Sequence, residues 1–456
     1  MRIVECGMLN NTMINAKRLL IPILLILCLI IAHPVEAKPV GKRIVLENGM
    51  ILLLAEKHEI PMVTVHVAIK AGSTAVPADK PGLASITASL LTQGTTKRSA
   101  NQINREIDFI GGSLSTAGGE DFVSANLRVL RKDIRSGLDL LSDVLLNPAF
   151  EQKEIERKVR ETLAEIQRQK QEPGIVANQA FAKAVFGNHP YGRTNDEVAA
   201  YYAKLTRQDI VDFYSSQYSP DHAIIAVVGD VTEGEIVDLL NDYFKAWQKR
   251  TQPLPALAQP PVLDKIVVQK IDRDIAQANI DLGHIGISRE NPDFYAVSVM
   301  NYILGGGGFS SRLMDNIRDS KGLAYDVHSV FSAQKEPGAF TVTIQTKNES
   351  ANDVIAETQK EIRRIQTELV SEKELADAKA YLTGNFPLKM DTYAKIAGVL
   401  TSIEIYDLGL DYPQRYPILV NGVTREDIRR MANEYLHPDR MVIVVVANLE
   451  RAKLKY

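Results

Sequence analysis

The sequence predicts an α+β protein of two homologous domains, each with a sheet backed by helices. Three observations predict it: the chain repeats itself, a proline-rich stretch separates the copies, and each copy mixes strand clusters with long helices. At 456 residues the chain is long enough for two large domains. Hydrophobic residues are 45% and charged residues 24%, values typical of a globular protein with a real core.

The internal repeat is the strongest of these observations. Thr206-Arg207-Gln208-Asp209-Ile210 matches Thr424-Arg425-Glu426-Asp427-Ile428, and at this offset of 218 nine of the 23 positions from 206 to 228 are identical. Average composition would give about one or two identities. Both copies read as a helix, a Pro-Asp turn and a hydrophobic strand, expected at Ala223–Val228 and Met441–Val446.

Proline marks the boundary between the copies. Gln252-Pro253-Leu254-Pro255 is followed closely by Gln259-Pro260-Pro261. Proline at this density cannot continue a helix or a central strand, so residues 251–261 are predicted to be a linker. The domains are then predicted at 42–250 and 262–456.

Within the first copy, strands and helices are readable in order. An Asn-Gly pair between Arg43–Glu47 and Met50–Ala55 is a strong hairpin signal. Val63–Ile69 alternates valine and isoleucine onto one face, which predicts a third strand. Apolar residues at helical spacing over Ile134–Leu145 and a charged stretch over Gln152–Gln171 predict two helices.

The first 37 residues are predicted to be a signal peptide. Lys17 and Arg18 precede an apolar run from Leu19 to Ala32, which is shorter than the ~20 residues of a transmembrane helix and typical of a signal-peptide core. Ala37 offers a small residue before a cut. The chain is therefore expected to be exported, to the periplasm or another extracytoplasmic space. An uncleaved membrane anchor is the alternative.

Composition excludes several chemistries. The two cysteines, Cys6 and Cys28, both lie in the targeting segment, so the remainder has no disulfide scaffold, cysteine nucleophile or thiolate metal site. A net charge of −3 gives no reason to expect nucleic acid as a partner. No G-x-x-x-x-G-K-[ST] loop and no G-x-S-x-G elbow is present.

Histidine spacing excludes a zinc helix. Beyond the targeting segment the closest pair is His58 and His66, so neither H-E-x-x-H nor H-x-x-E-H can occur. Distant histidines could still converge in space. His222 and His437 follow or precede Pro-Asp turns and are expected at the surface.

One block nevertheless resembles a metallopeptidase family. Gly82-Leu83-Ala84, then Gly94-Thr95 and Lys97-Arg98-Ser99-Ala100, resemble the N-terminal block of the pitrilysin/insulinase-type (inverted zincin) metallopeptidases, whose frame is G-L-A-H-x-x-E-H-x-x-x-x-G-T. His189-Pro190-Tyr191-Gly192 and the repeated Thr-Arg-x-Asp blocks also resemble the family. The resemblance covers nearly all of 42–450 and implies two mostly antiparallel sheets backed by helices.

The sequence departs from the family pattern at the positions of the zinc ligands and the general base. Ser85 and Ser89 stand where the family has its two zinc histidines, and Ala88 replaces the glutamate that acts as general base. Glu165 lies where the family places its third ligand, but one carboxylate does not hold zinc. A solvated or salt-bridged helix residue is the alternative interpretation of Glu165. We therefore expect no metal and no cofactor in this chain.

The second copy carries the other half of the family pattern. Gly305-Gly306-Gly307-Gly308, interpreted as a substrate loop or simply a flexible loop, precedes Phe309-Ser310-Ser311-Arg312-Leu313. Arg318 and Tyr325 then resemble the pair that faces the catalytic zinc across the family's chamber. Peptide hydrolysis builds negative charge on the carbonyl oxygen, and a guanidinium and a phenol can donate to it. Alternatively, Arg318 is an exposed helix residue and Tyr325 a core aromatic; Arg312 is assigned to structure.

The resemblance implies a non-catalytic, substrate-binding subunit of an exported, zinc-dependent heterodimeric peptidase. A homologous partner carrying H-x-x-E-H would hold the zinc, and Arg318 and Tyr325 would act in trans on the peptide substrate. The chain would be inactive alone and active only in the complex. The alternative is a metal-free peptide-binding or scaffold pseudopeptidase, as a monomer or a homodimer. A self-sufficient peptidase with an unrecognised site is a third interpretation.

Overall fold

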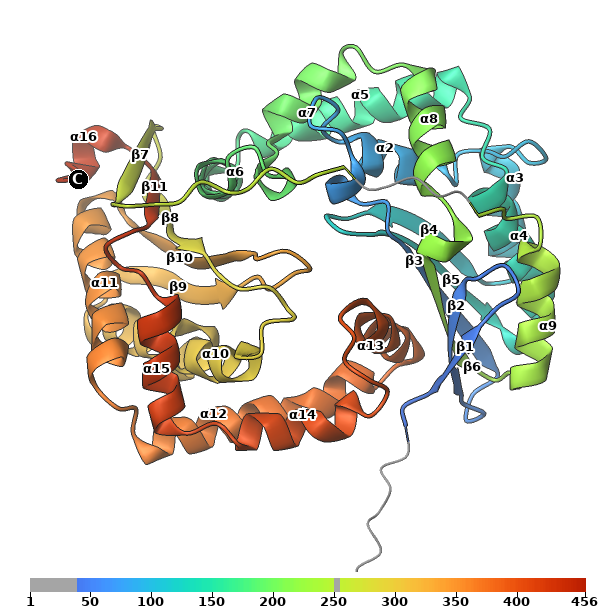
Figure 1. The fold of residues 1–456 in the computed structure, drawn as a ribbon. Helices are drawn as coiled ribbons and strands as arrows, with labels where there is room; N and C mark the ends of the chain where they lie inside the picture. The colour runs from blue at the N-terminus through green and yellow to red at the C-terminus, as the bar shows by residue number, and fades with distance from the viewer. Residues whose placement is uncertain (1–38, 250–254) are drawn as a thin grey trace, which may run out of the picture. The chain divides into compact units, whose positions relative to one another are not determined.

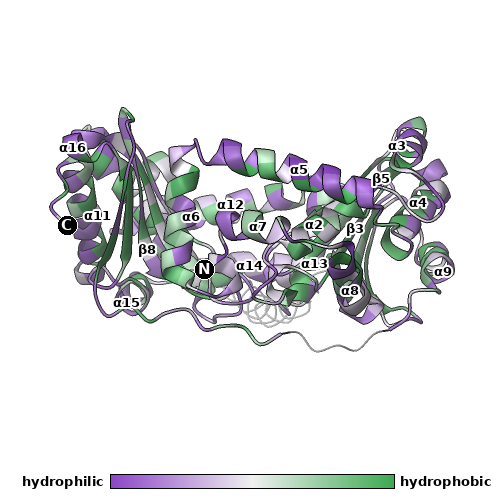
Figure 2. Cartoon of the chain, turned by 90° about the horizontal axis from the view of Figure 1, so that it is seen from above, coloured by the Kyte–Doolittle hydropathy of each residue, from purple (hydrophilic) through white to green (hydrophobic). Residues whose placement is uncertain are grey.

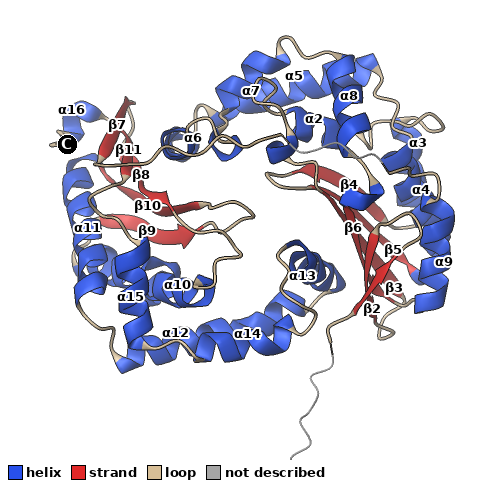
Figure 3. Cartoon of the chain, viewed as in Figure 1, coloured by secondary structure: helices blue, strands red, loops and turns tan. Residues whose placement is uncertain are grey.

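The computed structural model describes residues 39–249 and 255–456. The predicted signal segment and residues 251–254 of the predicted linker lie outside the described residues, while 255–261 contains neither helix nor strand. In the described ranges no helix combines the length and apolar character needed to cross a membrane. The described chain forms two sheets covered by helices, so the predicted α+β class is confirmed (Figures 1 and 3).

The first sheet has six strands in the order β1-β2-β6-β3-β5-β4. Only the β2–β6 pair is parallel; the other neighbours are antiparallel. The strands are β1 (Lys42–Val45), β2 (Ile51–Glu56), β3 (Met62–Ile69), β4 (Ser113–Gly118), β5 (Val123–Leu130) and β6 (Ala223–Gly229). The predicted hairpin is β1–β2, turning at Gly49 with φ of 89°.

The second sheet repeats this plan without the extra edge strand. Its order is β7-β11-β8-β10-β9, and only β7–β11 is parallel. The strands are β7 (Val267–Asp272), β8 (Gln277–Ile285), β9 (Ala324–Phe331), β10 (Ala339–Lys347) and β11 (Val442–Ala447). The order β2-β6-β3-β5-β4 in the first half thus corresponds to β7-β11-β8-β10-β9 in the second, and each half ends in an edge strand, β4 or β9.

Helices and short helical turns connect the strands in both halves. In the first half they are η1 (Ser73–Ala75), α2 (Leu83–Leu90), α3 (Ala100–Phe109), η2 (Arg131–Asp133), α4 (Ile134–Leu146), α5 (Gln152–Gln169), α6 (Pro173–Phe186), η3 (Pro190–Gly192), α7 (Asn195–Tyr202), α8 (Arg207–Gln217), η4 (Pro220–His222) and α9 (Glu233–Phe244). In the second half they are α10 (Phe294–Asn301), η5 (Tyr302–Gly306), η6 (Gly308–Ser310), η7 (Met314–Ser320), η8 (Asn348–Ser350), α11 (Ala351–Thr367), α12 (Glu372–Asn385), η9 (Phe386–Met390), α13 (Tyr393–Ile405), α14 (Tyr412–Asn421), α15 (Arg425–Tyr435) and α16 (Leu449–Ala452).

The repeated Thr-Arg-x-Asp block has a structural cause. In both copies the threonine and the aspartate form a capping box at the start of a helix, α8 or α15. The arginine donates to a backbone carbonyl just before a long helix: Arg207 to Phe150 at 2.8 Å, and Arg425 to Val370 at 2.5 Å. The repeat therefore encodes the same capped helix start and the same arginine-to-carbonyl hydrogen bond, here called the arginine clamp, in both halves.

The two halves exchange a helix. On α6, Ala177, Phe181 and Val185 pack against the second sheet, on Val442, Val444 and Val446 of β11. On α13, Ile396, Ala397 and Leu400 pack against the first sheet, on Ile224, Ala226 and Val228 of β6. Figure 1 shows α6 beside β8 and β11.

This exchange explains why β6 and β11 are apolar without alternation. Every residue of both strands is buried, since the remaining side chains face their own half's core. By contrast, α5 is largely hydrophilic in Figure 2, whereas the strands of both sheets are hydrophobic. The alternating valines and isoleucine of β3 are 0% exposed and belong to the first core, as predicted.

Candidate functional site

The helix that would hold zinc in the family is present, but its side chains offer no metal ligand. Ser85 is exposed on α2, Ser89 is partly buried, and its Oγ donates to the Ile86 carbonyl at 2.8 Å. Ala88 is 0% exposed. Hydroxyls that are not ionised are poor zinc ligands beside imidazole, so these residues do not fit the metal.

The strand beside α2 leaves little room for larger groups. A Cβ added to Gly118 at the end of β4 would lie 2.6 Å from the Cα of Ser85. Thr116 of the same strand donates to the Ala88 carbonyl at 2.7 Å. The edge strand β4 and α2 are therefore in direct backbone contact.

Glu165 is committed to its own helix, α5. Its Oε1 accepts from Arg168 at 2.6 Å and from Gln169 at 2.9 Å, and its Oε2 accepts from Arg168 at 2.9 Å. These bonds lower the pKa of Glu165 to about 2. This geometry is the salt-bridged helix residue that the sequence left as the alternative. Within residues 39–249 and 255–456, no three His, Cys, Asp or Glu side chains are placed to hold a metal ion.

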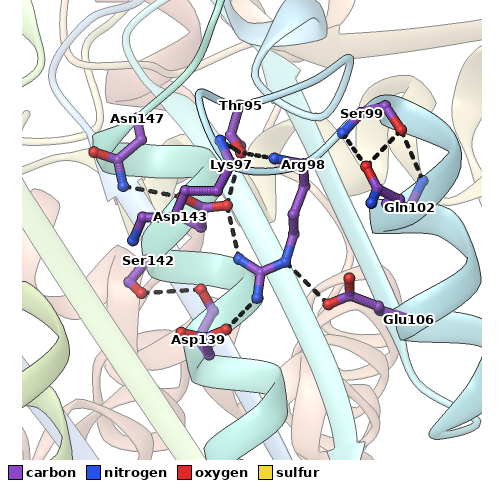
Figure 4. A network of polar contacts seen from close by, with 10 residues as sticks. All are labelled: Thr95, Lys97, Arg98, Ser99, Gln102, Glu106, Asp139, Ser142, Asp143 and Asn147. Atoms are coloured by element: carbon purple, nitrogen blue, oxygen red, sulfur yellow. Dashed lines mark hydrogen bonds and ion pairs between the residues drawn. The ribbon is translucent and has the colours of Figure 1, made fainter.

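The rest of the N-terminal block builds structure. Arg98 bonds to Asp143 at 2.8 Å and also pairs with Asp139 on α4 (Figure 4). Thr95 donates to Asp143 at 2.7 Å. Burial alone would raise the pKa of Asp143, but the bonds from Thr95 and Arg98 hold it below its usual value. Ser99 caps α3.

The His-Pro-Tyr-Gly motif is also a structural joint. His189 caps η3 by accepting the N–H of Tyr191, and the Tyr191 hydroxyl donates to Asp121 at 2.7 Å. The adjacent Arg193 donates to the carbonyls of Ser73, Val76 and Pro77. These contacts fix α6 and the turn after it.

The structure brings Arg318 and Tyr325 together with a third residue, Phe309, while their predicted role toward substrate stays a prediction. The Arg318 guanidinium carbon lies 4.9 Å from the Phe309 ring centroid and 5.9 Å from that of Tyr325. Both rings are largely exposed, at 71% and 69%. We call these three residues the Arg–aromatic cluster. The interpretation of Tyr325 as a core aromatic is wrong, because its ring is in solvent.

Arg318 is an available cation. Its guanidinium reaches the Met314 sulfur at 3.9 Å, but in the described part of the chain it forms no ion pair. A guanidinium has five donors in a planar fork and stays charged at any physiological pH. The cluster can therefore bind a carbonyl or carboxylate oxygen, with the tyrosine hydroxyl as a further donor.

The local fold explains the spacing of seven residues between Arg318 and Tyr325. Arg318 lies in the π-helical turn η7, and Gly322, with φ of 62°, lets the chain reverse into β9. Asn316 in the same turn donates to Glu361 at 2.8 Å and Glu357 at 3.2 Å on α11. These anchors hold η7, while Arg318 itself forms no ion pair in the described part of the chain. π-helical turns are frequent at functional sites.

The glycine segment is a packed turn. A Cβ on Gly305 would lie 2.4 Å from the Ser329 Oγ of β9, and one on Gly307 would lie 2.7 Å from the Tyr302 carbonyl. Gly306 is equally close to Asn301, and Gly308 has φ of 56° with open space around it. The flexible-loop interpretation is wrong for Gly305–Gly307; contact with substrate stays a prediction.

Arg312, in the same motif, has a different environment from Arg318. It is 9% exposed and binds both carboxylate oxygens of Glu374, at 2.6 and 3.1 Å. Burial would raise the pKa of Glu374, but the bonds from Arg312 and Ser371 together outweigh it and bring the pKa to about 2. Arg312 therefore joins the glycine motif to α12, in agreement with its structural assignment.

Sequence reasoning missed Phe309 and misplaced His437. The signal for Phe309 was present, since an aromatic residue directly follows four glycines at a turn. His437 was expected at the surface, but it is partly buried. Its backbone N–H donates to His284 Nε2 at 3.0 Å, and the centroids of the two imidazole rings lie 4.8 Å apart. The two histidines are 153 positions apart in the sequence, and no local pattern indicates their contact.

The chain consists of two repeated α+β halves. In the first, α2 packs on the edge strand β4, and in the second, the Arg–aromatic cluster lies beside the edge strand β9. This arrangement defines the class of the protein as peptidase-like. Residues 51–209 match the family described as Insulinase (Peptidase family M16), and residues 204–382 match the Peptidase M16 inactive domain. The chain belongs to peptidase family M16.

Curated relatives and solved structures agree with this assignment. The chain is 25% identical to the uncharacterized zinc protease YmxG of Bacillus subtilis over 77% of this chain and 85% of the relative. It is 29% identical to an uncharacterized zinc protease of Mycobacterium leprae over 76% and 79%. A crystal structure described as the peptidase M16 inactive domain of Pseudomonas fluorescens has 29% identity, a TM-score of 0.83 and coverage of 89% and 98%. A Helicobacter pylori protease shares the fold, with a TM-score of 0.83 at 20% identity, covering 90% and 99%.

Proposed function

We propose that this chain is the non-catalytic, substrate-binding subunit of an exported, zinc-dependent heterodimeric peptidase. Its Arg–aromatic cluster would act in trans on a peptide whose hydrolysis depends on a metal held by the partner. The partner would be a homologous chain carrying H-x-x-E-H. The predicted signal segment supports export.

The observation that carries this proposal is the unpaired Arg318 between two exposed rings. An arginine that is buried for structural reasons is usually paired, as Arg312 is with Glu374. Arg318 has no such partner among the described residues and lies beside the edge strand β9. Donors held in place before the reaction stabilise charge that develops on a carbonyl oxygen, because no reorganisation is needed when that charge appears.

The residues at the family's zinc positions also support a chain that binds substrate while a partner holds the metal. Ser85, Ala88 and Ser89 supply no imidazole and no base, and the Glu165 carboxylate is already bonded to Arg168 and Gln169. These residues do not fit zinc. The peptidase-family scaffold, the substrate-side cluster and the unsuitable metal positions together favour a subunit over a self-sufficient enzyme.

The test is reconstitution with a homologous H-x-x-E-H chain from the same source. The proposal expects the two chains to co-elute in size exclusion and to cleave a fluorogenic peptide only when combined. If this chain co-elutes with no such partner yet binds peptides by itself, as a monomer or a homodimer, the metal-free scaffold alternative replaces the proposal. Cleavage by this chain alone would favour the third interpretation.

A further inference from the structure

A cavity with a largely apolar lining and a few charged and imidazole groups lies outside the Arg–aromatic cluster. It has a volume of about 330 Å³ and is bordered by Pro260–Leu263, which comprise the end of the linker and the first residues after it. The same cavity receives His189 from the first half and His437, Arg440 and Glu336 from the second. Its size is at the lower end of small-molecule sites.

His189 presents a fixed hydrogen-bond donor. The residue is 3% exposed, and its Nδ1 accepts the Tyr191 N–H at 3.2 Å. Burial lowers the pKa of His189, so the ring is neutral near pH 7 and its proton is on Nε2. Nε2 has no hydrogen-bond partner in the described chain, so a buried side chain keeps an unused donor at the cavity.

His437 is held in the same tautomer by a different neighbour. Arg440, which can only donate, approaches the His437 Nδ1 at 3.3 Å, so Nδ1 accepts and Nε2 carries the proton. Burial and the Arg440 charge lower the pKa of His437, which keeps it neutral. His284 forms the wall behind it, with Nδ1 bonded to the Ile285 carbonyl at 2.8 Å and Nε2 to the His437 N–H.

Two opposite charges remain unpaired at this cavity. Within residues 39–249 and 255–456, neither Arg440 nor Glu336 forms an ion pair. The Glu336 backbone N–H is close to the Tyr191 hydroxyl, at 3.4 Å, which places this hairpin residue against the first half. The cavity thus offers a cation with imidazole donors, a separate carboxylate and an apolar wall.

We propose that this cavity binds a zwitterionic α-amino acid or dipeptide with an apolar side chain. Its carboxylate is recognised by Arg440 and the histidine N–H donors, its ammonium by Glu336, and its side chain by Pro260–Leu263. Neither charge of such a ligand would be left unpaired, which is the condition for burying it. The inference goes beyond the proposed function and needs neither partner nor turnover.

The test is calorimetric titration of the purified full chain with four matched probes: leucine, leucyl-leucine, leucinamide and N-acetyl-leucine. Saturable binding of leucine or leucyl-leucine is expected, and the stronger of the two identifies the source as a free amino acid or a peptide. Leucinamide lacks the carboxylate and N-acetyl-leucine lacks the ammonium, so each should bind about tenfold more weakly or worse.

Variants assign each charge to its residue. Arg440→Gln should weaken leucine but not leucinamide, and Glu336→Gln should weaken leucine but not N-acetyl-leucine. Arg429→Gln and Glu426→Gln, exposed and outside the cavity, are the matched controls. The proposal is overturned if none of the four probes binds at millimolar concentration, if the blocked probes bind as well as leucine, or if the controls weaken binding equally.

Discussion

The connection between β3 and β4 in the first half differs from its counterpart between β8 and β9 in the second. The first runs through α2 and α3, and the second runs through α10 and the short turns η5, η6 and η7. Both pack against an edge strand, α2 on β4 and η7 on β9. Yet α2 carries only uncharged side chains, whereas η7 carries Arg318, which lies near two exposed rings and forms no ion pair in the described part of the chain.

This difference shows which parts of a duplicated fold can change independently. The capping boxes, the arginine clamps and the exchanged helices are repeated because they hold each sheet together. The connection to the edge strand also contributes buried residues to each core, but its polar side chains differ between the halves. On our account the second half keeps a substrate-side function and the first half serves as scaffold.

The largest expected effect tests the exchanged helices, a feature that the two halves share. Phe181→Ala on α6 and Leu400→Ala on α13 should each lower the free energy of unfolding, by ~3–5 and ~2–5 kcal/mol, because both side chains are buried against the sheet of the other half. Urea denaturation measures this, with Ile418→Ala, 70% exposed, as the control. Losses below about 1 kcal/mol for both variants would show that the halves are not interlocked by these helices.

The next effect tests the Arg–aromatic cluster, the feature by which the second half differs from the first. Arg318→Ala and Tyr325→Phe should each reduce kcat of the reconstituted peptidase by ~10²–10³, because both groups would donate mainly to charge that develops during reaction. Steady-state cleavage of a fluorogenic peptide measures kcat, with complex formation checked by size exclusion.

Three further variants of the cluster sharpen this test. Arg318→Lys should rescue only partly, since a point charge does not copy the guanidinium fork. The double variant should lose less than the sum of the two single losses, because both groups serve one substrate segment. Arg312→Ala, the control, should reduce stability more than kcat. Wild-type kcat for both single variants in an intact complex contradicts the trans role.

A smaller, pH-dependent effect comes from the second half alone. Burial lowers the pKa of His284 to about 4, compared with about 6.5 in an unfolded chain. Between these values the unfolded state binds a proton that the folded state does not. Stability is therefore full above about pH 6.5 and falls as the pH drops toward 4, by up to roughly 3 kcal/mol. Urea unfolding of wild type and His284→Gln at several pH values should show a smaller acid loss in the variant; equal slopes would contradict it.

The smallest effect concerns Phe309. An exposed cation–π contact stabilises its partners by ~0.5–1 kcal/mol, so Phe309→Leu should reduce kcat/KM of the complex only about two- to fivefold. Phe309→Tyr should retain activity because it keeps the ring. Phe109→Leu, a 92% exposed phenylalanine on α3, is the control. An equal loss in Phe309→Leu and Phe109→Leu would remove Phe309 from the cluster.

Local patterns predicted much of this fold, and distant contacts account for what was missed. The Asn-Gly hairpin, the strand Val63–Ile69 and the repeated capping boxes depend on neighbours in sequence, so their residues are enough to predict them. The helix exchange depends on contacts between α6 and β11, far apart in the chain. The unbroken apolar runs of β6 and β11 were its one local sign, because a strand covered on one face alternates.

The candidate site divides in the same way. The spacing of Arg318 and Tyr325 was readable, but the π-helical turn, the exposure of Tyr325 and the role of Phe309 needed the packing of η5 and η7 on β9. Glu165 matched the family by position only, and its bonds to Arg168 and Gln169 depend on rotamers that the sequence does not specify.

The division between a metal-binding partner and a substrate-binding chain is the central claim, and zinc content measures it most directly. Elemental analysis of each purified chain, paired with cleavage of a fluorogenic peptide, should find no stoichiometric zinc and no activity in this chain. The partner should carry the zinc, and cleavage should appear only on mixing. About one zinc per copy of this chain, lost on Glu165→Gln and accompanied by cleavage without a partner, would contradict the account.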